Sequence, residues 1–298
     1  MKILIAGGTG FIGNALTEWL VDNAYEVNVL SRKQLPDCNG VHHYLWNVDN
    51  GYIDPIAFEG VEAIINLTGA NIGESRWTAN RKQTIIDSRV KALALLRDSV
   101  SKYGHEIEVL ISSSAVGYYG AVTTDKVFSE DDDSGDDFLS DVCRRWEDEA
   151  YKFEPIVGRV VILRKGVVLA PGGGMMKKLK PLARLGINVA MGTGQQYLPW
   201  ICMKDLLEIY CHILHHSSCR GVYNAVSSEH ITMNEFSIAL LKSYGCPNWL
   251  PNVPSWAVRM LVGEMSAMLL EGSRVSNEKI KSEGFTFEYP IIEQCLKR

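Results

Sequence analysis

Residues 1–20 read MKILIAGGTGFIGNALTEWL, and this stretch decides the fold. The apolar run 3–6 is short, as in a buried β-strand, and apolar residues recur at helical spacing from Ile12 to Leu20. Gly7, Gly10 and Gly13 lie at or within the junction of the two segments. The sequence therefore predicts a strand, a glycine-rich turn and a helix in direct succession.

The glycines follow the spacing G-x-x-G-x-x-G between a strand and a helix, which is the context of a dinucleotide-binding turn. Gly7 permits the tight turn, Gly10 lets the backbone approach a pyrophosphate, and Gly13 allows close packing of the helix on the strand. The helix start offers free amides to the same phosphates. A turn that only requires positive φ is the alternative. We predict that the dinucleotide contacts Gly7, Thr9, Gly10, Phe11, Ile12 and Gly13.

The end of the second predicted strand indicates which dinucleotide is bound. An acidic residue there would accept hydrogen bonds from a free ribose and repel a 2′-phosphate. The strand ends instead in Leu30-Ser31-Arg32-Lys33. Because a hydroxyl and two cations suit a phosphate, Ser31 and Arg32 favour NADP over NAD. For Lys33, an ordinary solvated loop is the alternative.

Strand-like and helix-like segments alternate over the first 165 residues or so. The strand-like segments are apolar without strict alternation, which is typical of parallel strands covered on both faces. This order predicts an α/β fold of the Rossmann type, a doubly wound parallel sheet with right-handed crossovers. The later strands are predicted at 26–30, 63–67, 109–112 and 159–163, and helices around 86–100 and 138–150.

The alternation stops beyond Leu169, where the glycine-rich segments 171–174 and 192–194 interrupt it. We expect residues 1–170 to form the NADP-binding Rossmann domain. The segment 202–226 is expected to return to this domain and to add a strand at its end, over residues 222–226.

The remaining segments, 171–201 and 227–298, would form a smaller C-terminal α/β region that binds the substrate. A helix is predicted at 256–270, ending near Gly272. The cations between Lys177 and Arg184 either contact an anionic substrate or form a solvated helical face.

Composition and charge limit the partners. Thirty Lys and Arg against 35 Asp and Glu give a net charge of −5, which does not favour nucleic acid. Residues 1–6 hold too short an apolar run for a signal peptide, and no stretch keeps about 18 apolar residues together, as a membrane helix requires. We expect a cytoplasmic protein that binds a small molecule, as a monomer or a homodimer.

Cysteine and histidine spacing gives little sign of a metal or a disulfide framework. The seven cysteines are scattered, without C-x-x-C spacing. Residue types that commonly bind zinc occur close together at Cys211, His212, His216 and Cys219. The apolar residues around them indicate an ordinary packed helix, so we predict no metal site.

Several motifs in order resemble one known family. They are Asn66–Gly69, Arg76–Thr78, Ser88-Arg89, Ser112–Gly120, Val142-Cys143, Trp146-Glu147, Arg164–Leu169, Gly192–Gln195 and Leu269–Val275. Over essentially all 298 residues the chain resembles the extended and atypical short-chain dehydrogenases/reductases, the NAD(P)-dependent epimerase/dehydratase-like proteins. The resemblance is strongest to the epimerase-family, cell-division-inhibitor-like subgroup.

The resemblance implies further cofactor-binding residues. Leu67, Thr68 and Gly69 would lie against the cofactor at the carboxyl edge of the sheet, where open sheets bind ligands. An ordinary strand-end turn is the alternative. Arg89 matches the subgroup's replacement for a usual active-site Asn and would reach the cofactor or the substrate, unless it is a salt-bridged helix residue.

The usual catalytic pair of the superfamily is absent. A typical member carries Tyr and Lys four apart on one helix, where the lysine charge favours the phenolate. Glu147 fixes the register of the matching helix and places Leu139 and Cys143 at those two positions. Leucine exchanges no proton, and a neutral thiol supplies no positive charge.

Ser114, Tyr118 and Cys143 are the catalytic candidates that remain. Ser114, or its neighbour Ser113, matches the serine that usually bonds a substrate carbonyl or hydroxyl. Tyr118 either transfers a proton or closes a pocket. Cys143 is a weak acid, a nucleophile or a packing residue, and a buried thiol is mostly inert.

Two hypotheses of function follow. The first is an NADP-dependent oxidoreductase or epimerase-like enzyme that acts on a small carbonyl or hydroxyl compound, with a nucleotide-sugar suggested by analogy of fold alone. In it, Ser114 positions the substrate oxygen and an unidentified group moves the proton. The second is a non-catalytic NADP-binding redox sensor or scaffold, which the missing catalytic pair favours.

Overall fold

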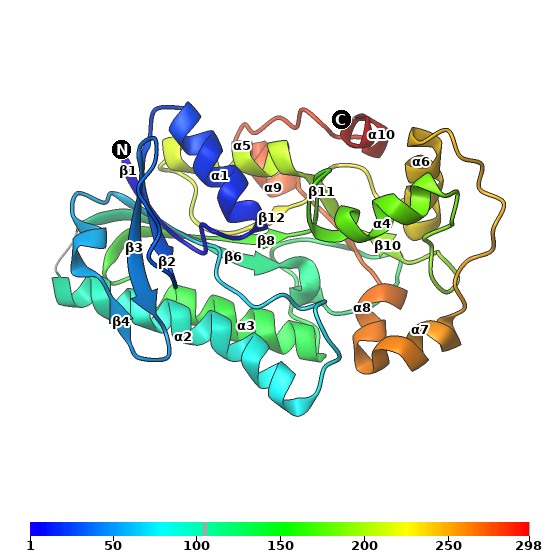
Figure 1. The fold of residues 1–298 in the computed structure, drawn as a ribbon, viewed down its shortest axis with the longest axis horizontal. Helices are drawn as coiled ribbons and strands as arrows, with labels where there is room; N and C mark the ends of the chain where they lie inside the picture. Colours follow the sequence, from blue (N-terminus) through cyan, green and yellow to red (C-terminus); the bar gives the residue numbers. More distant parts are fainter. Residues whose placement is uncertain (104–105, 298) are drawn as a thin grey trace.

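A computed structural model describes residues 1–103 and 106–297 and is built around one eight-stranded sheet (Figure 1). The strand order is β12-β8-β6-β5-β1-β2-β3-β4, and every neighbouring pair is parallel except β3 and β4. The strands are β1 (Lys2–Ala6), β2 (Glu26–Ser31), β3 (Val41–Asn47), β4 (Tyr52–Ile53), β5 (Ala63–Asn66), β6 (Ile107–Ala115), β8 (Val157–Lys165) and β12 (Gly221–Ala225).

Helices cover both faces of this sheet, as the doubly wound prediction requires. Figure 1 shows α1 (Phe11–Asp22) and α5 (Met203–His215) on one face and α2 (Ala79–Tyr103) and α3 (Phe138–Tyr151) on the other. Alternate strand residues enter separate cores, since Ile3 packs toward α1 and α5 while Leu4 packs toward α2 and α3. The predicted Rossmann fold is confirmed.

Two elements differ from the sequence-based expectation. Strands β3 and β4 were not predicted, because β3 carries His42 and His43 and is only partly buried at its start. The helix predicted at 256–270 is wrong as a single element. It is divided into α7 (Ser255–Val262), a 3-10 turn η3 (Gly263–Ser266) and α8 (Ala267–Leu270), because Gly263 takes a φ of +63°, which helical residues cannot adopt.

The C-terminal half adds a third core beside the sheet. Leu169, Trp200 and Phe236 belong to this core. No helix among the described residues is long and apolar enough to span a bilayer. The other elements are η1 (Pro55–Phe58), η2 (Val116–Tyr119), β7 (Val127–Phe128), β9 (Val167–Leu169), α4 (Gly174–Arg184), β10 (Tyr197–Leu198), β11 (Trp200–Cys202), β13 (Ile231–Thr232), α6 (Met233–Ser243), β14 (Arg274–Val275), α9 (Glu278–Ser282) and α10 (Ile292–Leu296).

Candidate functional site

The glycine turn joins β1 to α1 and packs against the end of β5. Gly7 has a φ of +85°, and a Cβ there would lie 2.9 Å from the carbonyl carbon of Leu67. A Cβ on Gly13 would lie 2.2 Å from the Gly7 carbonyl oxygen. Gly10 differs, because its backbone is extended and a Cβ would meet only that oxygen, at 3.3 Å. Packing thus requires glycine at positions 7 and 13. At position 10 there is room for a Cβ in the structure.

The start of α1 is suited to an anion. Gly10 is the N-cap, no side chain caps the helix, and the first turn contains no acid. The first amides of a helix lack intrahelical acceptors, and the helix dipole adds positive potential there. Thr9 is exposed beside these amides, and Ile12 packs on the core below them. This geometry fits a pyrophosphate.

Phe11 connects the turn with the C-terminal region. Its side chain is partly exposed and lies against the backbone of Gly173 and Gly174 at the start of α4. A Cβ on Gly173 would lie 2.1 Å from the Phe11 ring, so glycine is required there. The segment that follows β9 therefore borders the same site as the glycine turn.

The end of β2 carries a free cation. Ser31 is buried, and its hydroxyl accepts a hydrogen bond from the Lys33 amide at 3.2 Å. Arg32 is exposed and has no hydrogen-bond or ion-pair partner in the part of the chain that the structure describes. A guanidinium without a partner next to a hydroxyl fits the 2′-phosphate that the sequence predicts.

The end of β5 is held by its own side chains. Asn66 Oδ1 accepts hydrogen bonds from the amide and the hydroxyl of Thr68, at 3.2 and 2.6 Å. The Leu67 amide donates to the Ala6 carbonyl of β1. Gly69 faces Arg89, whose Cζ would lie 3.0 Å from a Cβ. Residues 67–69 are therefore fixed between the glycine turn and α2.

Arg89 is buried but forms no ion pair among the described residues. Its Nη1 donates to the Ile85 carbonyl at 2.8 Å and its Nη2 to the Ala70 carbonyl at 3.2 Å, while the guanidinium lies over the Trp146 ring. Burial lowers its pKa to about 10. The Nε group has no partner. The salt-bridge interpretation of Arg89 is wrong, and one buried donor is left for a ligand.

Ser114 belongs to a buried polar network below the sheet edge. Its hydroxyl donates to Glu147 of α3 at 2.6 Å, and Glu147 accepts two further hydrogen bonds from Arg164 of β8, at 2.9 and 2.8 Å. Burial opposes the charge of Arg164, but the bonds to Glu147 outweigh this and raise its pKa. A buried charge needs such a partner. This network fixes α3 against β6 and β8.

Tyr118 and Cys143 both contribute packing here. The Arg164 guanidinium lies 3.3 Å from the centroid of the Tyr118 ring. Cys143 is buried, its thiol donates to the Ala115 carbonyl, and burial raises its pKa to about 12. A thiol in this state is not a nucleophile at neutral pH. These contacts are those of a packing residue, and a catalytic role for Cys143 stays a prediction.

Leu139 and Cys143, at the positions of the absent catalytic pair, pack together against η2. A Cβ on Gly117 would lie 3.4 Å from Leu139 and 3.9 Å from the Cys143 sulfur. These two side chains fill the space with apolar contact. They leave no proton-exchanging group at this point of α3.

Lys165 lies at the site although sequence reasoning did not select it. It is the last residue of β8, and its Nζ donates to the Ser113 hydroxyl at 2.7 Å. Burial and the charge of Arg89 lower its pKa to about 7. A single lysine at the end of a strand is usually solvated. The only sequence signal that included Lys165 was the family motif Arg164–Leu169.

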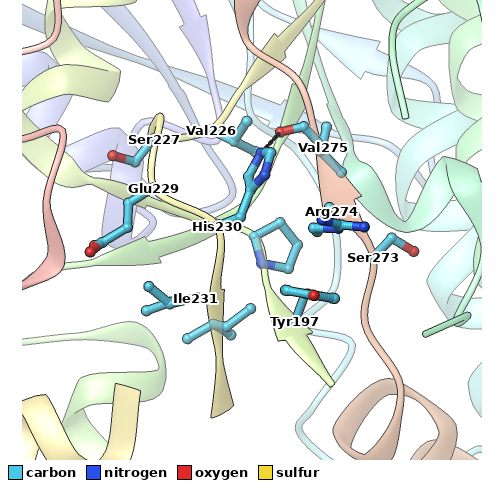
Figure 2. Close-up of a pocket in the computed structure, with 11 residues that line it drawn as sticks. Tyr197, Val226, Ser227, Glu229, His230, Ile231, Ser273, Arg274 and Val275 are labelled. Carbon is cyan, nitrogen blue, oxygen red and sulfur yellow. Dashed lines mark hydrogen bonds between the residues drawn. The ribbon is translucent and has the colours of Figure 1, made fainter. Parts of the chain in front are cut away.

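A separate small pocket lies outside this site (Figure 2). It is formed where β10 and β13 meet β14, with Tyr197, His230 and Arg274 in its wall, and the His230 imidazole is hydrogen-bonded to the Val275 carbonyl. Neither the glycine turn nor Ser114 contributes to it. Within the described residues, no group of three or more His, Cys, Asp or Glu side chains is placed to hold a metal.

Comparisons with known proteins agree with this geometry. The model of the NAD dependent epimerase/dehydratase family matches residues 3–225, and a domain of unknown function matches residues 253–298. An epimerase family protein of Mycobacterium bovis is 35% identical over 99% of this chain and 96% of its own length. The epimerase family protein SDR39U1 of Homo sapiens is 33% identical over 100% of this chain and 99% of its own length.

Solved structures show the same fold. A structure of human SDR39U1 (isoform 2) with NADPH has a TM-score of 0.86 and 31% identity, and the match covers 100% of this chain and 98% of that one. A UDP-glucose 4-epimerase from Thermotoga maritima, solved with UDP-glucose, has a TM-score of 0.81 at 18% identity, over 100% and 97% of the two chains. At that identity the second likeness concerns the fold alone.

Proposed function

This chain belongs to the NAD-dependent epimerase/dehydratase family, and from that membership we propose that it is an NADP-dependent oxidoreductase of the epimerase/dehydratase type, acting on a small carbonyl or hydroxyl compound. The observation that carries the proposal is the uncapped, acid-free start of α1, combined with the unpartnered Arg32 after β2. The NADPH in the structure of the human relative supports the same cofactor.

Residues from three strand ends and from helix α2 would hold the cofactor. The amides at the start of α1 would bind the pyrophosphate, and Ser31 with Arg32 would bind the 2′-phosphate. Leu67, Thr68 and Gly69 would line the carboxyl edge of the sheet, and the free Nε of Arg89 would offer a further donor. When bound, NADP supplies or accepts the hydride of the reaction.

Ser114 has a positioning role in this proposal. Its proton is directed at Glu147, so its oxygen can only accept a further hydrogen bond. It is also buried, with 1% of its surface exposed. Ser114 would therefore align the end of β6, and any contact with a substrate would be with a hydroxyl that donates.

A screen for turnover tests the proposed function. The purified full chain is incubated with NADPH or NADP+ and a panel of carbonyl compounds, alcohols and nucleotide-sugars, and nicotinamide absorbance is followed. We expect tight binding of NADPH and turnover of at least one compound. Failure to bind either form of NADP would contradict the proposal.

The second candidate is a non-catalytic NADP-binding sensor or scaffold. The observation that favours it is the apolar packing of Leu139 and Cys143 where the usual proton-exchanging pair would lie. Clear binding of NADPH without turnover across the panel would support this candidate over the enzyme.

A further inference from the structure

Lys165 is placed where the carboxyl ends of three parallel strands meet. It pairs with Ala115 of β6 on one side and with Ala225 of β12 on the other. Successive side chains of a strand point to opposite faces, so Lys165 lies on the opposite face from Arg164. Its Nζ reaches Ser113, next to Ser114 in β6. The ammonium is thus held at the sheet edge, outside the network of Glu147 and Arg164.

No carboxylate compensates this lysine among the described residues. The charged group that affects the Lys165 pKa is Arg89 of α2, and its positive charge lowers that pKa further. The thiol of Cys143 and the phenol of Tyr210 on α5 are both buried, and burial raises their pKa, so they stay neutral. Lys165 as a residue is partly exposed where β8 ends, at the edge of the sheet where open α/β sheets bind ligands.

Lys165 also borders the predicted cofactor site. The chain runs from Lys165 through β9 to Gly173 and Gly174, which lie against Phe11, the first residue of α1 after the glycine turn. Arg89, the neighbouring cation, packs against Gly69. A dinucleotide that starts at the α1 amides extends along this edge of the sheet. The reactive end of the cofactor and the amine would therefore share one space.

We propose that Lys165, held by Ser113, exchanges the proton with the substrate oxygen, in place of the tyrosine and lysine that α3 lacks. This inference rests on the proposed function. In the reducing direction, the carbonyl oxygen takes up its π-bond electron pair as hydride reaches the carbon. The N–H bond of the ammonium then breaks, an O–H bond forms, and the neutral amine regains its proton from water.

The chemistry of the surroundings suits this role. A general acid or base works best when its pKa lies near the operating pH, and burial together with Arg89 brings the Lys165 pKa to about 7. Ser113 is buried and accepts a hydrogen bond from the ammonium, so it holds the amine at the sheet edge. Cys143 fails this test, since burial raises its pKa and the thiol stays protonated.

Binding of the two redox forms of the cofactor tests the position and charge of Lys165 without turnover. The nicotinamide ring is cationic in NADP+ and neutral in NADPH, so a protonated Lys165 beside it disfavours only the oxidised form. The 2′-phosphate titrates equally in both forms and cancels in the ratio of their Kd values. Calorimetry at about pH 6 and about pH 9 measures this ratio on either side of the lysine pKa.

We expect the Kd of NADP+, relative to that of NADPH, to fall roughly tenfold from the lower to the higher pH. In Lys165→Met, which carries no charge, and Lys165→Arg, which does not titrate, the ratio should be constant. Lys102→Met removes an exposed lysine at the end of α2 and should behave as wild type. A pH-independent ratio in wild type, with both forms bound, would overturn the inference, whereas absence of binding would overturn the proposed function instead.

A second measurement follows the protonation of Lys165 itself in wild type. It does not require Lys165→Arg to bind NADPH normally. Reductive methylation with ¹³C-formaldehyde, followed by NMR of wild type, reports the titration of each lysine, and Lys165→Arg identifies the Lys165 signal. We expect this signal to titrate near neutral pH and to shift when NADPH is added. For any compound turned over, the inflection of kcat near neutral pH should be lost in Lys165→Arg. An ordinary lysine titration, unaffected by NADPH, would contradict the proposal.

Discussion

Arg32 is the residue on which the choice of cofactor depends. Its guanidinium is exposed and unpartnered among the described residues, so all of its donors are available to a ligand. Hydrogen bonds to charged groups contribute about 1.5–3 kcal/mol. We expect Arg32→Ala to weaken NADPH binding by roughly ten- to a hundredfold and to leave NADH binding nearly unchanged, as measured by calorimetry. Equal losses for both nucleotides would show that Arg32 does not read the 2′-phosphate.

Lys165 should impose a pH dependence on stability. Its pKa is lowered from 10.5 to about 7 in the folded chain, so the unfolded chain binds the extra proton between these values. The penalty of burying the ammonium is fully present below about pH 7 and declines as the pH rises toward 10.5. Relative to Lys165→Met, the unfolding free energy of wild type should rise between pH 7 and 9, by at most about 1.4 kcal/mol per pH unit.

Urea unfolding of both proteins across this pH range measures the difference. The loss of the hydrogen bond to Ser113 adds a constant, so only the slope is diagnostic. Lys102→Met serves as the control and should show no slope relative to wild type. Parallel curves for wild type and Lys165→Met would refute a depressed lysine pKa.

Replacing only one partner of the buried ion pair between Glu147 and Arg164 should strongly destabilise the fold. Both side chains are about 95% buried, and either one alone would be an uncompensated charge. We expect Glu147→Gln to lower the unfolding free energy by about 3–5 kcal/mol, and the double variant with Arg164→Met to cost less than the sum of the two single changes. The matched control is Glu293→Gln, whose pair with Lys242 is exposed and should contribute little to stability. Additive effects at Glu147 and Arg164 would contradict the coupling.

At the residue scale, the sequence predicted local geometry better than the state of buried groups. Gly7, Gly13 and Arg32 have the geometry expected of them because their signals are local: a fixed spacing and a charge at a strand end. Lys165 was missed because its burial depends on Ser113 and Arg89, which are distant in sequence. The state of Cys143 likewise depends on how α3 packs against η2.

At the scale of the element, the glycine turn offers a matched pair of substitutions. A methyl group on Gly13 would collide with the Gly7 carbonyl, so Gly13→Ala should destabilise the fold by about 2–3 kcal/mol. Gly10→Ala should be well tolerated, because its backbone is extended and the added carbon meets one atom only. The added methyl at Gly10 should instead weaken NADPH binding, since the backbone must approach the pyrophosphate there. Thermal unfolding and nucleotide titration of both variants separate the two effects, and similar melting temperatures would contradict the packing role of Gly13.

Elements with strong apolar runs were predicted within a few residues, and those with weaker patterns were not. Strands β1, β2, β5, β6 and β8 are buried between helix layers, so their apolar character is visible in the sequence. Strand β3 is held mainly by its backbone pairing with β2, and its sequence has no comparable apolar run. The helical spacing of apolar residues continues past Gly263 in the sequence. Helix α7 nevertheless ends at Val262, because Gly263 has a positive φ.

At the scale of the whole molecule, the chain order brings the two halves together at one sheet edge. The sheet reverses its order between β1 and β5, and the crevice at such a point is where open α/β sheets bind ligands. Arg76, ahead of α2, donates to the Met260 and Leu261 carbonyls at the end of α7, so the C-terminal region is tied to the loop that follows β5. The C-terminal region could not be predicted in this detail, because its contacts are long-range and its elements are short.

A crystal structure of the full chain with bound NADPH tests the central claim most directly. We expect the pyrophosphate at the start of α1, the 2′-phosphate at Ser31 and Arg32, and the nicotinamide at the carboxyl ends of β5, β6 and β8, within contact of Lys165. A nicotinamide directed away from Lys165, or a nucleotide bound outside the glycine turn, would contradict it.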